Sequence, residues 1–171
     1  QGKRDRAMLA VLLYHGLRAT ELCLLRIKDY AERRGVRMLC IHGKGGKLRY
    51  IPVHPKAVAA INDYLEESNH AASEETPLFI PSPERSRRMK PMLRQRVREL
   101  ILRYNKNGLE LPRGTARPHA LRATAATNAL EHGADIAKVQ DWLGHANPAT
   151  TRLYDKRKNR PEDSPTFRVV Y

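Results

Sequence analysis

The chain has 171 residues, with 32 Lys and Arg against 18 Asp and Glu, and a formal net charge of +14. This length suits one domain, and a hydrophobic fraction of 41% can form a buried core, which excludes a wholly disordered basic tail. No apolar run approaches the roughly eighteen residues of a membrane span. So high a charge indicates a polyanionic partner. Nucleic acid is favoured over a membrane surface, because the chain has only one Trp and two Phe to insert.

The N-terminal part of the sequence predicts two helices. Residues 6–13 join a polar start to an apolar run, which is typical of a buried helix, and Gly16 marks its end. A second helix is expected over residues 19–25, with Thr20 near its N-cap. The side chains that we expect to face the core there are Leu22, Leu24 and Leu25.

A small antiparallel sheet is predicted next. Residues 36–41 and 48–53 are apolar runs joined by a glycine-rich link, which favours a β-hairpin. Residues 78–80 are expected to add a short third strand. The fold class is therefore α+β, mostly helical, with a three-stranded antiparallel sheet.

The other expected elements are helices. The basic segment 85–106 carries Leu93, Val97, Leu100 and Ile101 at helical spacing, so these four should face inward. The remaining predicted helices, separated by Pro and Gly residues, cover 56–67, 118–131, 135–143 and about 148–155. The end of the chain, from Thr166, is β-prone.

The sequence gives little support to metal chemistry. Cys23 and Cys40 lie in apolar stretches without zinc-ligand spacing, so both are interpreted as small core residues in a reducing compartment. The acidic residues Asp135, Asp141 and Asp155 are scattered, and neither a metalloprotease motif nor a P-loop occurs. We expect no metal and no other cofactor, so side-chain cations would have to neutralise a reacting phosphate.

Several polar residues could serve that purpose. His119 and Arg122 are three residues apart on a predicted helix and could hold one phosphate together. Singly, each candidate has an ordinary explanation. A helix face can simply be solvated, Lys44 can be a turn lysine, and Arg18 can pair with Glu21. Their order along the chain is the stronger signal.

That order resembles the catalytic domain of the tyrosine recombinases, the phage integrase family, from about residue 6 to residue 155. The matching segments are GLRATEL at 16–22, GKGGKLR at 43–49, PHALR at 118–122, and LGH at 143–145 followed nine residues later by Tyr154. One departure is Ala123, where the family often has His. The resemblance implies the family's DNA breaking-rejoining fold. It also implies a catalytic set of Arg18, Lys44, His119, Arg122, His145 and Tyr154, with Glu21 supporting Arg18.

The resemblance also implies a reaction, metal-independent DNA cleavage and rejoining through a 3′-phosphotyrosine. Tyr154 would attack the scissile phosphate and His119 would accept its proton. Arg18 and Arg122 would stabilise the added negative charge, and His145 would hydrogen-bond the phosphate. Lys44 would protonate the leaving 5′-oxygen, although Lys47 lies on the same turn.

Further expectations concern DNA and assembly. The basic residues expected to contact double-stranded DNA are Lys47, Arg49, Arg87, Arg88, Arg94 and Arg117. Residues 1–155 would form the catalytic core and 156–171 a C-terminal tail, with the family's N-terminal core-binding domain outside this chain. We expect a monomer that forms a homotetramer on DNA, with the tail docking on a neighbour or folding back. We expect the protein to be cytoplasmic and associated with the nucleoid.

Other classes of protein remain open at this point. A non-catalytic DNA-binding regulator of the same fold would account for the charge. A type IB topoisomerase would use nearly the same catalytic set. His119, His145 and Lys44 could also form a ribonuclease-like acid–base group, which would need no tyrosine. Within the recombinases, integration, excision, dimer resolution and transposition share one catalytic set.

Overall fold

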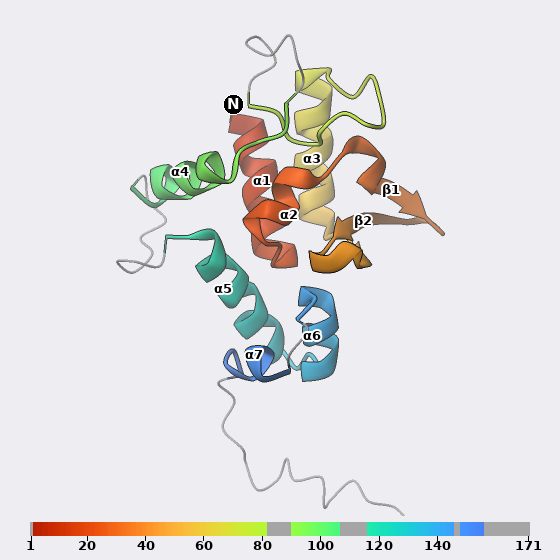
Figure 1. The fold of residues 1–171 in the computed structure, drawn as a ribbon. Coiled ribbons are helices and arrows are strands. Elements are labelled where there is room, and N and C mark those ends of the chain that lie inside the picture. The colour runs from red at the N-terminus through yellow and green to blue at the C-terminus, as the bar shows by residue number, and fades with distance from the viewer. Residues whose placement is uncertain (1, 82–89, 107–115, 146–147, 156–171) are drawn as a thin grey trace, which may run out of the picture.

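The computed structural model describes residues 2–81, 90–106, 116–145 and 148–155. The small sheet lies to the right of helices α1 and α2 in Figure 1. In chain order the helices are α1 (Gly2–His15), α2 (Ala19–Leu24), α3 (Pro55–Ser68), α4 (Arg94–Tyr104), α5 (Pro118–Glu131), α6 (Ile136–Leu143) and α7 (Pro148–Arg152). None of the described helices is both long and apolar enough to cross a bilayer.

The main core lies where α1 packs against α3 and α5. The residues that α1 buries recur every three or four positions, so one face of the helix is apolar: Ala7, Met8, Val11 and Leu12. The matching face of α3 consists of Ala57, Ala60, Ile61 and Tyr64. The sequence predicted helices over residues 6–13 and 56–67, and the structure confirms a helix in each place.

The sheet has three antiparallel strands in the order β1 (Tyr30–Arg33), β2 (Val36–His42) and β3 (Leu48–Pro52). The predicted hairpin is confirmed as β2 and β3, and the 3₁₀ turn η2 (Lys44–Gly46) lies at its tip. Leu39 and Ile41 are fully buried, so the alternate residues of β2 point away from the core. Cys40 is one of these and is partly exposed. The prediction that it is a core residue is wrong, whereas Cys23 is buried as expected.

The predicted third strand at residues 78–80 is also wrong. These three residues are all buried, and the Leu78 amide donates to the Leu25 carbonyl at 2.8 Å, but no strand forms. Residues 30–33 supply the third strand instead, and they pair with β2 from Tyr30–Leu39 to Arg33–Val36. Glu32 and Arg33 are exposed at this sheet edge, so β1 lacks an apolar alternation.

The ends of two predicted helices need correction. Arg18, rather than Thr20, is the N-cap of α2, and Leu24 is 58% exposed rather than buried. In α4 the buried side chains are Val97, Leu100 and Ile101. Leu93 precedes the first turn as the N-cap and is 67% exposed, so it does not share their apolar face.

A second, smaller apolar cluster joins α5 to α6, below the main body in Figure 1. Its buried members are Ala126, Leu130, Val139 and Leu143. Trp142 packs against both this cluster and the main core. At the junction Gly16 has a φ of 57°, and a Cβ there would lie 2.8 Å from Leu143 Cδ2. A glycine suits this position because a side chain would be strained at this φ and would displace Leu143.

Candidate active site

Arg18 is held at the N-terminus of α2 by Glu21. Its backbone amide donates to Glu21 Oε2 at 2.8 Å, and its Nη1 donates to Oε1 at 2.7 Å. Nη2 lies 3.5 Å from the Gly144 carbonyl oxygen. The side chain remains 42% exposed, so Arg18 offers an oriented positive charge to solvent.

Glu21 is the buried centre of this arrangement, with a side chain that is 5% exposed. Arg49 of β3 donates from Nη1 to Oε1 at 3.1 Å and from Nη2 to Oε2 at 2.9 Å. Burial opposes ionisation of Glu21, but hydrogen bonds from Arg49 and Arg18 outweigh it, so the pKa of Glu21 is lowered. Glu21 is therefore a carboxylate at neutral pH.

Arg122 lies on the second turn of α5 and is 2% exposed. It donates from Nη1 to the Gly16 carbonyl and from Nη2 to the Leu143 carbonyl, both at 2.6 Å. Burial and the nearby charge of Arg18 lower its pKa to about 10, which Glu21 partly opposes. Arg122 thus stays charged at neutral pH and is fixed in position by two carbonyls.

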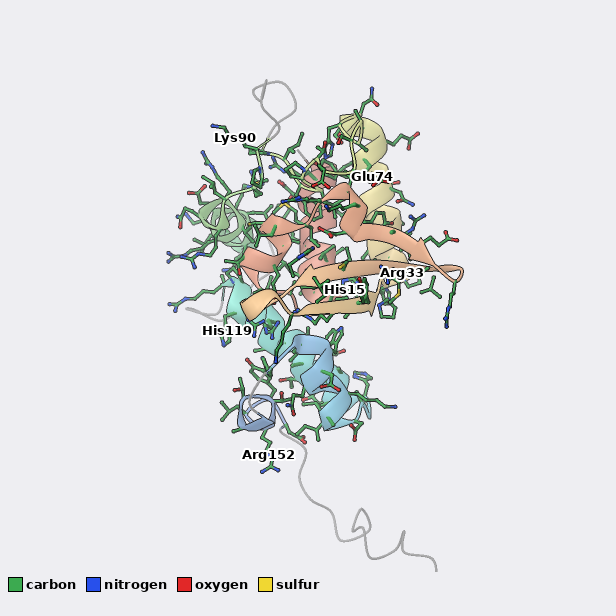
Figure 2. The ribbon with its side chains drawn as sticks, turned by 45° about the vertical axis from the view of Figure 1, so that its right-hand side comes forward. His15, Arg33, Glu74, Lys90, His119 and Arg152 are labelled. Atoms are coloured by element: carbon green, nitrogen blue, oxygen red, sulfur yellow. The ribbon has the colours of Figure 1, made fainter. Side chains whose placement is uncertain are left out.

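These arginines border a pocket of about 590 Å³ between α2, α4 and α5. Arg18, His119 and Arg122 line it together, and His119 is exposed on the first turn of α5 (Figure 2). The other basic side chains that line the pocket are Arg94, Arg98 and Arg117. The pocket therefore gathers cations from three helices, which suits a phosphate group.

His145 and Tyr154 lie beside this group, with their ring centroids 6.0 Å apart. His145 Nδ1 is 2.9 Å from the hydroxyl of buried Thr151. Burial, and then the positive charges of Arg122 and Arg18, lower the pKa of His145 to about 4. His145 is consequently neutral at pH 7. Tyr154 follows α7, and its carbonyl accepts a hydrogen bond from Thr127 at 3.3 Å.

The structure thus brings together five of the six predicted catalytic residues: Arg18, His119, Arg122, His145 and Tyr154. The sixth, Lys44, lies in η2 at the hairpin tip, and Lys47 is exposed just after it.

The predicted DNA contacts fall into three groups. Arg94 and Arg117 line the pocket, while Arg87 and Arg88 lie outside the described residues. Arg49 points inward instead. Its side chain is 14% exposed, and its Nε donates to the Trp142 carbonyl at 3.1 Å. Arg98 belongs to the basic stretch from which the sequence predicts some DNA backbone contacts, and its position four residues after Arg94 puts both on one face of α4 and in the pocket lining.

One group of described side chains has ligand atoms close enough to share a metal ion: Asp29, Cys40 and His42. It contains none of the predicted catalytic residues.

Comparison with known proteins identifies the family of the chain. The phage integrase family profile matches residues 1–160. The chain is 36% identical over 151 residues to tyrosine recombinase XerC of Nitrobacter winogradskyi, which covers 88% of this chain and 45% of that protein. It is 37% identical over 155 residues to tyrosine recombinase XerA of Thermococcus kodakarensis, covering 90% of this chain and 51% of that protein.

Solved structures show the same fold. A crystal structure of XerA recombinase matches with a TM-score of 0.73 and 29% identity, covering 99% of this chain and 60% of that one. XerH recombinase bound to its difH substrate before cleavage matches with a TM-score of 0.76 and 25% identity. The match covers 91% of this chain and 43% of the XerH chain. The chain belongs to the phage integrase family. It spans about half the length of the curated relatives that it matches.

Proposed function

We propose that this chain is the catalytic part of a site-specific DNA recombinase that cleaves and rejoins double-stranded DNA without a metal ion. The observation that carries the proposal is that Arg18 and Arg122 meet at buried Glu21, with His145 and Tyr154 close to Arg122. Relatives named tyrosine recombinases, and the XerH complex with its DNA substrate, support the same reaction.

In this mechanism Tyr154 is the nucleophile. Its oxygen attacks the scissile phosphorus and forms a 3′-phosphotyrosyl bond, while the bond to the 5′-oxygen breaks. His119 accepts the phenolic proton. Arg18 and Arg122 hold the non-bridging oxygens, where negative charge increases in the transition state. Rejoining is the reverse step, because the phosphotyrosyl bond keeps the phosphate activated.

His145 acts as a neutral hydrogen-bond donor. Its pKa of about 4 leaves the ring uncharged at neutral pH. When the Thr151 hydroxyl donates to Nδ1, the ring proton lies on Nε2 and can be donated to a phosphate oxygen. Lys44 is the general acid that protonates the leaving 5′-oxygen. It lies in η2, at the tip of the β2–β3 hairpin.

The remaining cations hold the DNA backbone. Arg94, Arg98 and Arg117 line the same pocket as Arg18, so they can contact phosphates next to the scissile one. We further propose that residues 1–155 form the catalytic core. Residues 156–171, which lie outside the described residues, would mediate tetramer formation on DNA, and the protein would act on nucleoid DNA in the cytoplasm.

A covalent trapping experiment tests the reaction. The chain is incubated with a pool of duplexes that carry a 5′-bridging phosphorothiolate flanked by random sequence. Cleavage releases a 5′-thiol, which rejoins poorly, so the phosphotyrosyl adduct accumulates. The expected result is a covalent protein–DNA adduct that Tyr154→Phe abolishes and Tyr50→Phe retains. Tyr50 is an exposed tyrosine of β3 and serves as the matched control.

The other classes of protein give different results in the same assay. DNA binding without any adduct indicates a regulator. Adducts without sequence enrichment, together with relaxation of supercoiled plasmid, indicate a topoisomerase. RNA cleavage that survives Tyr154→Phe indicates a ribonuclease. Each of these three results would overturn the proposed recombinase.

A further inference from the structure

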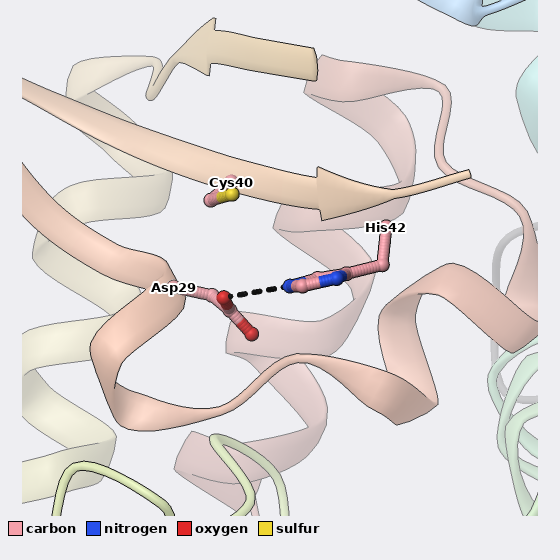
Figure 3. A group of neighbouring side chains, drawn as sticks. All are labelled: Asp29, Cys40 and His42. Carbon is pink, nitrogen blue, oxygen red and sulfur yellow. Dashed lines mark hydrogen bonds and ion pairs between the residues drawn. The ribbon is translucent and has the colours of Figure 1, made fainter. Parts of the chain in front are cut away.

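Three different metal-ligating side chains meet where the second half of β2 passes η1, close to the turn of the β2–β3 hairpin (Figure 3). Asp29 ends the 3₁₀ turn η1 (Ile27–Asp29), while Cys40 and His42 alternate on β2 and therefore share its outer face. One ligand atom from each lies within 4.8 Å of the others. We propose that Asp29, Cys40 and His42 form a binding site for a zinc ion.

The donor set suits zinc. Zinc accepts carboxylate oxygen, imidazole nitrogen and thiolate sulfur, commonly with three protein ligands and one water. Zn–N and Zn–O bonds of about 2.1 Å at tetrahedral angles place the two ligand atoms roughly 3.3 Å apart. His42 Nε2 and Asp29 Oδ1 are 3.1 Å apart, so only a small shift of these two side chains would admit the ion, and Cys40 Sγ lies within 4.8 Å of both atoms. The side chain of His42 is 49% exposed, which leaves an open side for water.

Asp29 is already fixed in a ligating position. It is 4% exposed, and its Oδ2 accepts the Arg26 backbone amide at 2.9 Å, so Oδ1 is the oxygen directed at His42. The two nearest cations on the same loop, Arg26 and Lys28, both pair with Glu75, which offsets their repulsion of a metal ion.

Charge balance also favours the site. A carboxylate and a thiolate together carry two negative charges, which match Zn²⁺, and the imidazole binds as a neutral ligand. Binding releases the Cys40 thiol proton to solvent. An ordinary Asp29–His42 ion pair accounts for two of the three residues, but it assigns no role to Cys40. The bound ion would link the end of β2 to η1, two residues before Lys44.

Metal titration of the chain distinguishes these two explanations. After removal of metals with a chelator, the protein is titrated with Zn²⁺ against a chromophoric competitor, and separately with Co²⁺. We expect one ion per chain, and Co²⁺ should give the thiolate charge-transfer band of a tetrahedral site. Cys40→Ser should abolish this band. His42→Gln should weaken Zn²⁺ binding by more than the roughly 10- to 100-fold loss typical of removing an outer-sphere partner.

Cys23→Ser is the matched control, because Cys23 is the buried cysteine of α2 and lies outside the group. It should retain both the cobalt band and the zinc affinity. Circular dichroism of each variant checks that it is folded, and Cys40 and His42 are exposed enough for polar replacement. Zinc binding that survives Cys40→Ser and His42→Gln, or no binding at micromolar zinc, would overturn the site. None of these readouts depends on DNA cleavage.

Discussion

Arg49 and Glu21 form two parallel hydrogen bonds, of 3.1 and 2.9 Å, between a guanidinium and a carboxylate that are both largely shielded from solvent. The same guanidinium donates to the Trp142 carbonyl, so one side chain connects β3, α2 and the end of α6. Glu21 in turn orients Arg18. Arg49 therefore positions Arg18 through Glu21, and Arg49 does not itself line the pocket.

Replacing Arg49 should destabilise the fold. In Arg49→Leu, Glu21 keeps its bonds from Arg18 but loses two charged hydrogen bonds, so we expect a loss of about 2–3 kcal/mol in the free energy of unfolding. Urea denaturation at neutral pH measures it. Arg33→Leu is the control. Arg33 is exposed and stacks on Tyr50, so its loss should cost below about 1 kcal/mol. Equal losses in the two variants would contradict the role assigned to Arg49.

The role of Arg49 could not be predicted from the sequence. In sequence it is one of many arginines, and its neighbours Lys44 and Lys47 suggest a DNA-binding turn. Its partners, Glu21 and the Trp142 carbonyl, are 28 and 93 residues away, so only the tertiary fold identifies them. A charge count cannot separate a buried arginine from a solvated one.

The pattern of apolar residues and the order of the motifs predicted more of the structure than the charge count did. An apolar run predicted α1, apolar spacing after Pro55 predicted α3, and motif order predicted the group around Arg18 and Tyr154. The strand β1 was missed because Glu32 and Arg33 lie at an exposed edge, where burial imposes no alternation. Cys40 was misassigned because Leu39 and Ile41 beside it are buried, and the pleat turns it to the other face.

A side chain at Gly144 should destabilise the fold. It has a φ of 65°, and an added Cβ would lie 3.0 Å from Arg49 Nη1. Gly133 has a φ of 87° with no atom within 4 Å of an added Cβ, so Gly133→Ala measures backbone strain alone, roughly 1–2 kcal/mol. Gly144→Ala should cost about 1 kcal/mol or more beyond that value, because Arg49 must shift. Thermal unfolding of both variants checks the difference, and equal costs would refute the contact.

His15 should make stability depend on pH. Its ring is buried, donates from Nδ1 to the Val11 carbonyl at 3.1 Å and accepts the His54 amide at Nε2 at 3.0 Å, which requires the neutral form. Burial and the nearby His54 lower its pKa from 6.5 to about 4, against the effect of Val11. Below pH 6.5 the unfolded chain binds the proton first. The stability contributed by neutral His15 is thus complete above pH 6.5 and declines as the pH falls toward 4.

The expected decline is about 2 kcal/mol between pH 7 and pH 5 for this residue. Urea denaturation at both pH values measures it, and His15→Gln should remove that part of the pH dependence. His132→Gln should leave the dependence unchanged, since His132 is exposed at the end of α5. An NMR titration that gave His15 an ordinary pKa would contradict the prediction even if the variant were poorly folded.

The choice between Lys44 and Lys47 as general acid depends on the leaving group. An alkoxide leaving from an ordinary phosphodiester needs a proton, whereas a thiolate, whose acid has a pKa of ~8.5, leaves without one. Lys44→Ala should therefore slow cleavage of the ordinary substrate by roughly 10²- to 10⁴-fold. The same variant should approach the wild-type rate on a 5′-bridging phosphorothiolate.

Lys47→Ala is the matched variant, because Lys47 is exposed on the same hairpin, immediately after η2. It should weaken DNA binding and reduce the salt dependence of affinity by about one phosphate contact, with similar effects on both substrates. Single-turnover rates at saturating protein separate cleavage from binding. If the phosphorothiolate rescued Lys47→Ala and not Lys44→Ala, the general acid would be Lys47, because only the residue that donates the proton becomes dispensable when the leaving group needs none.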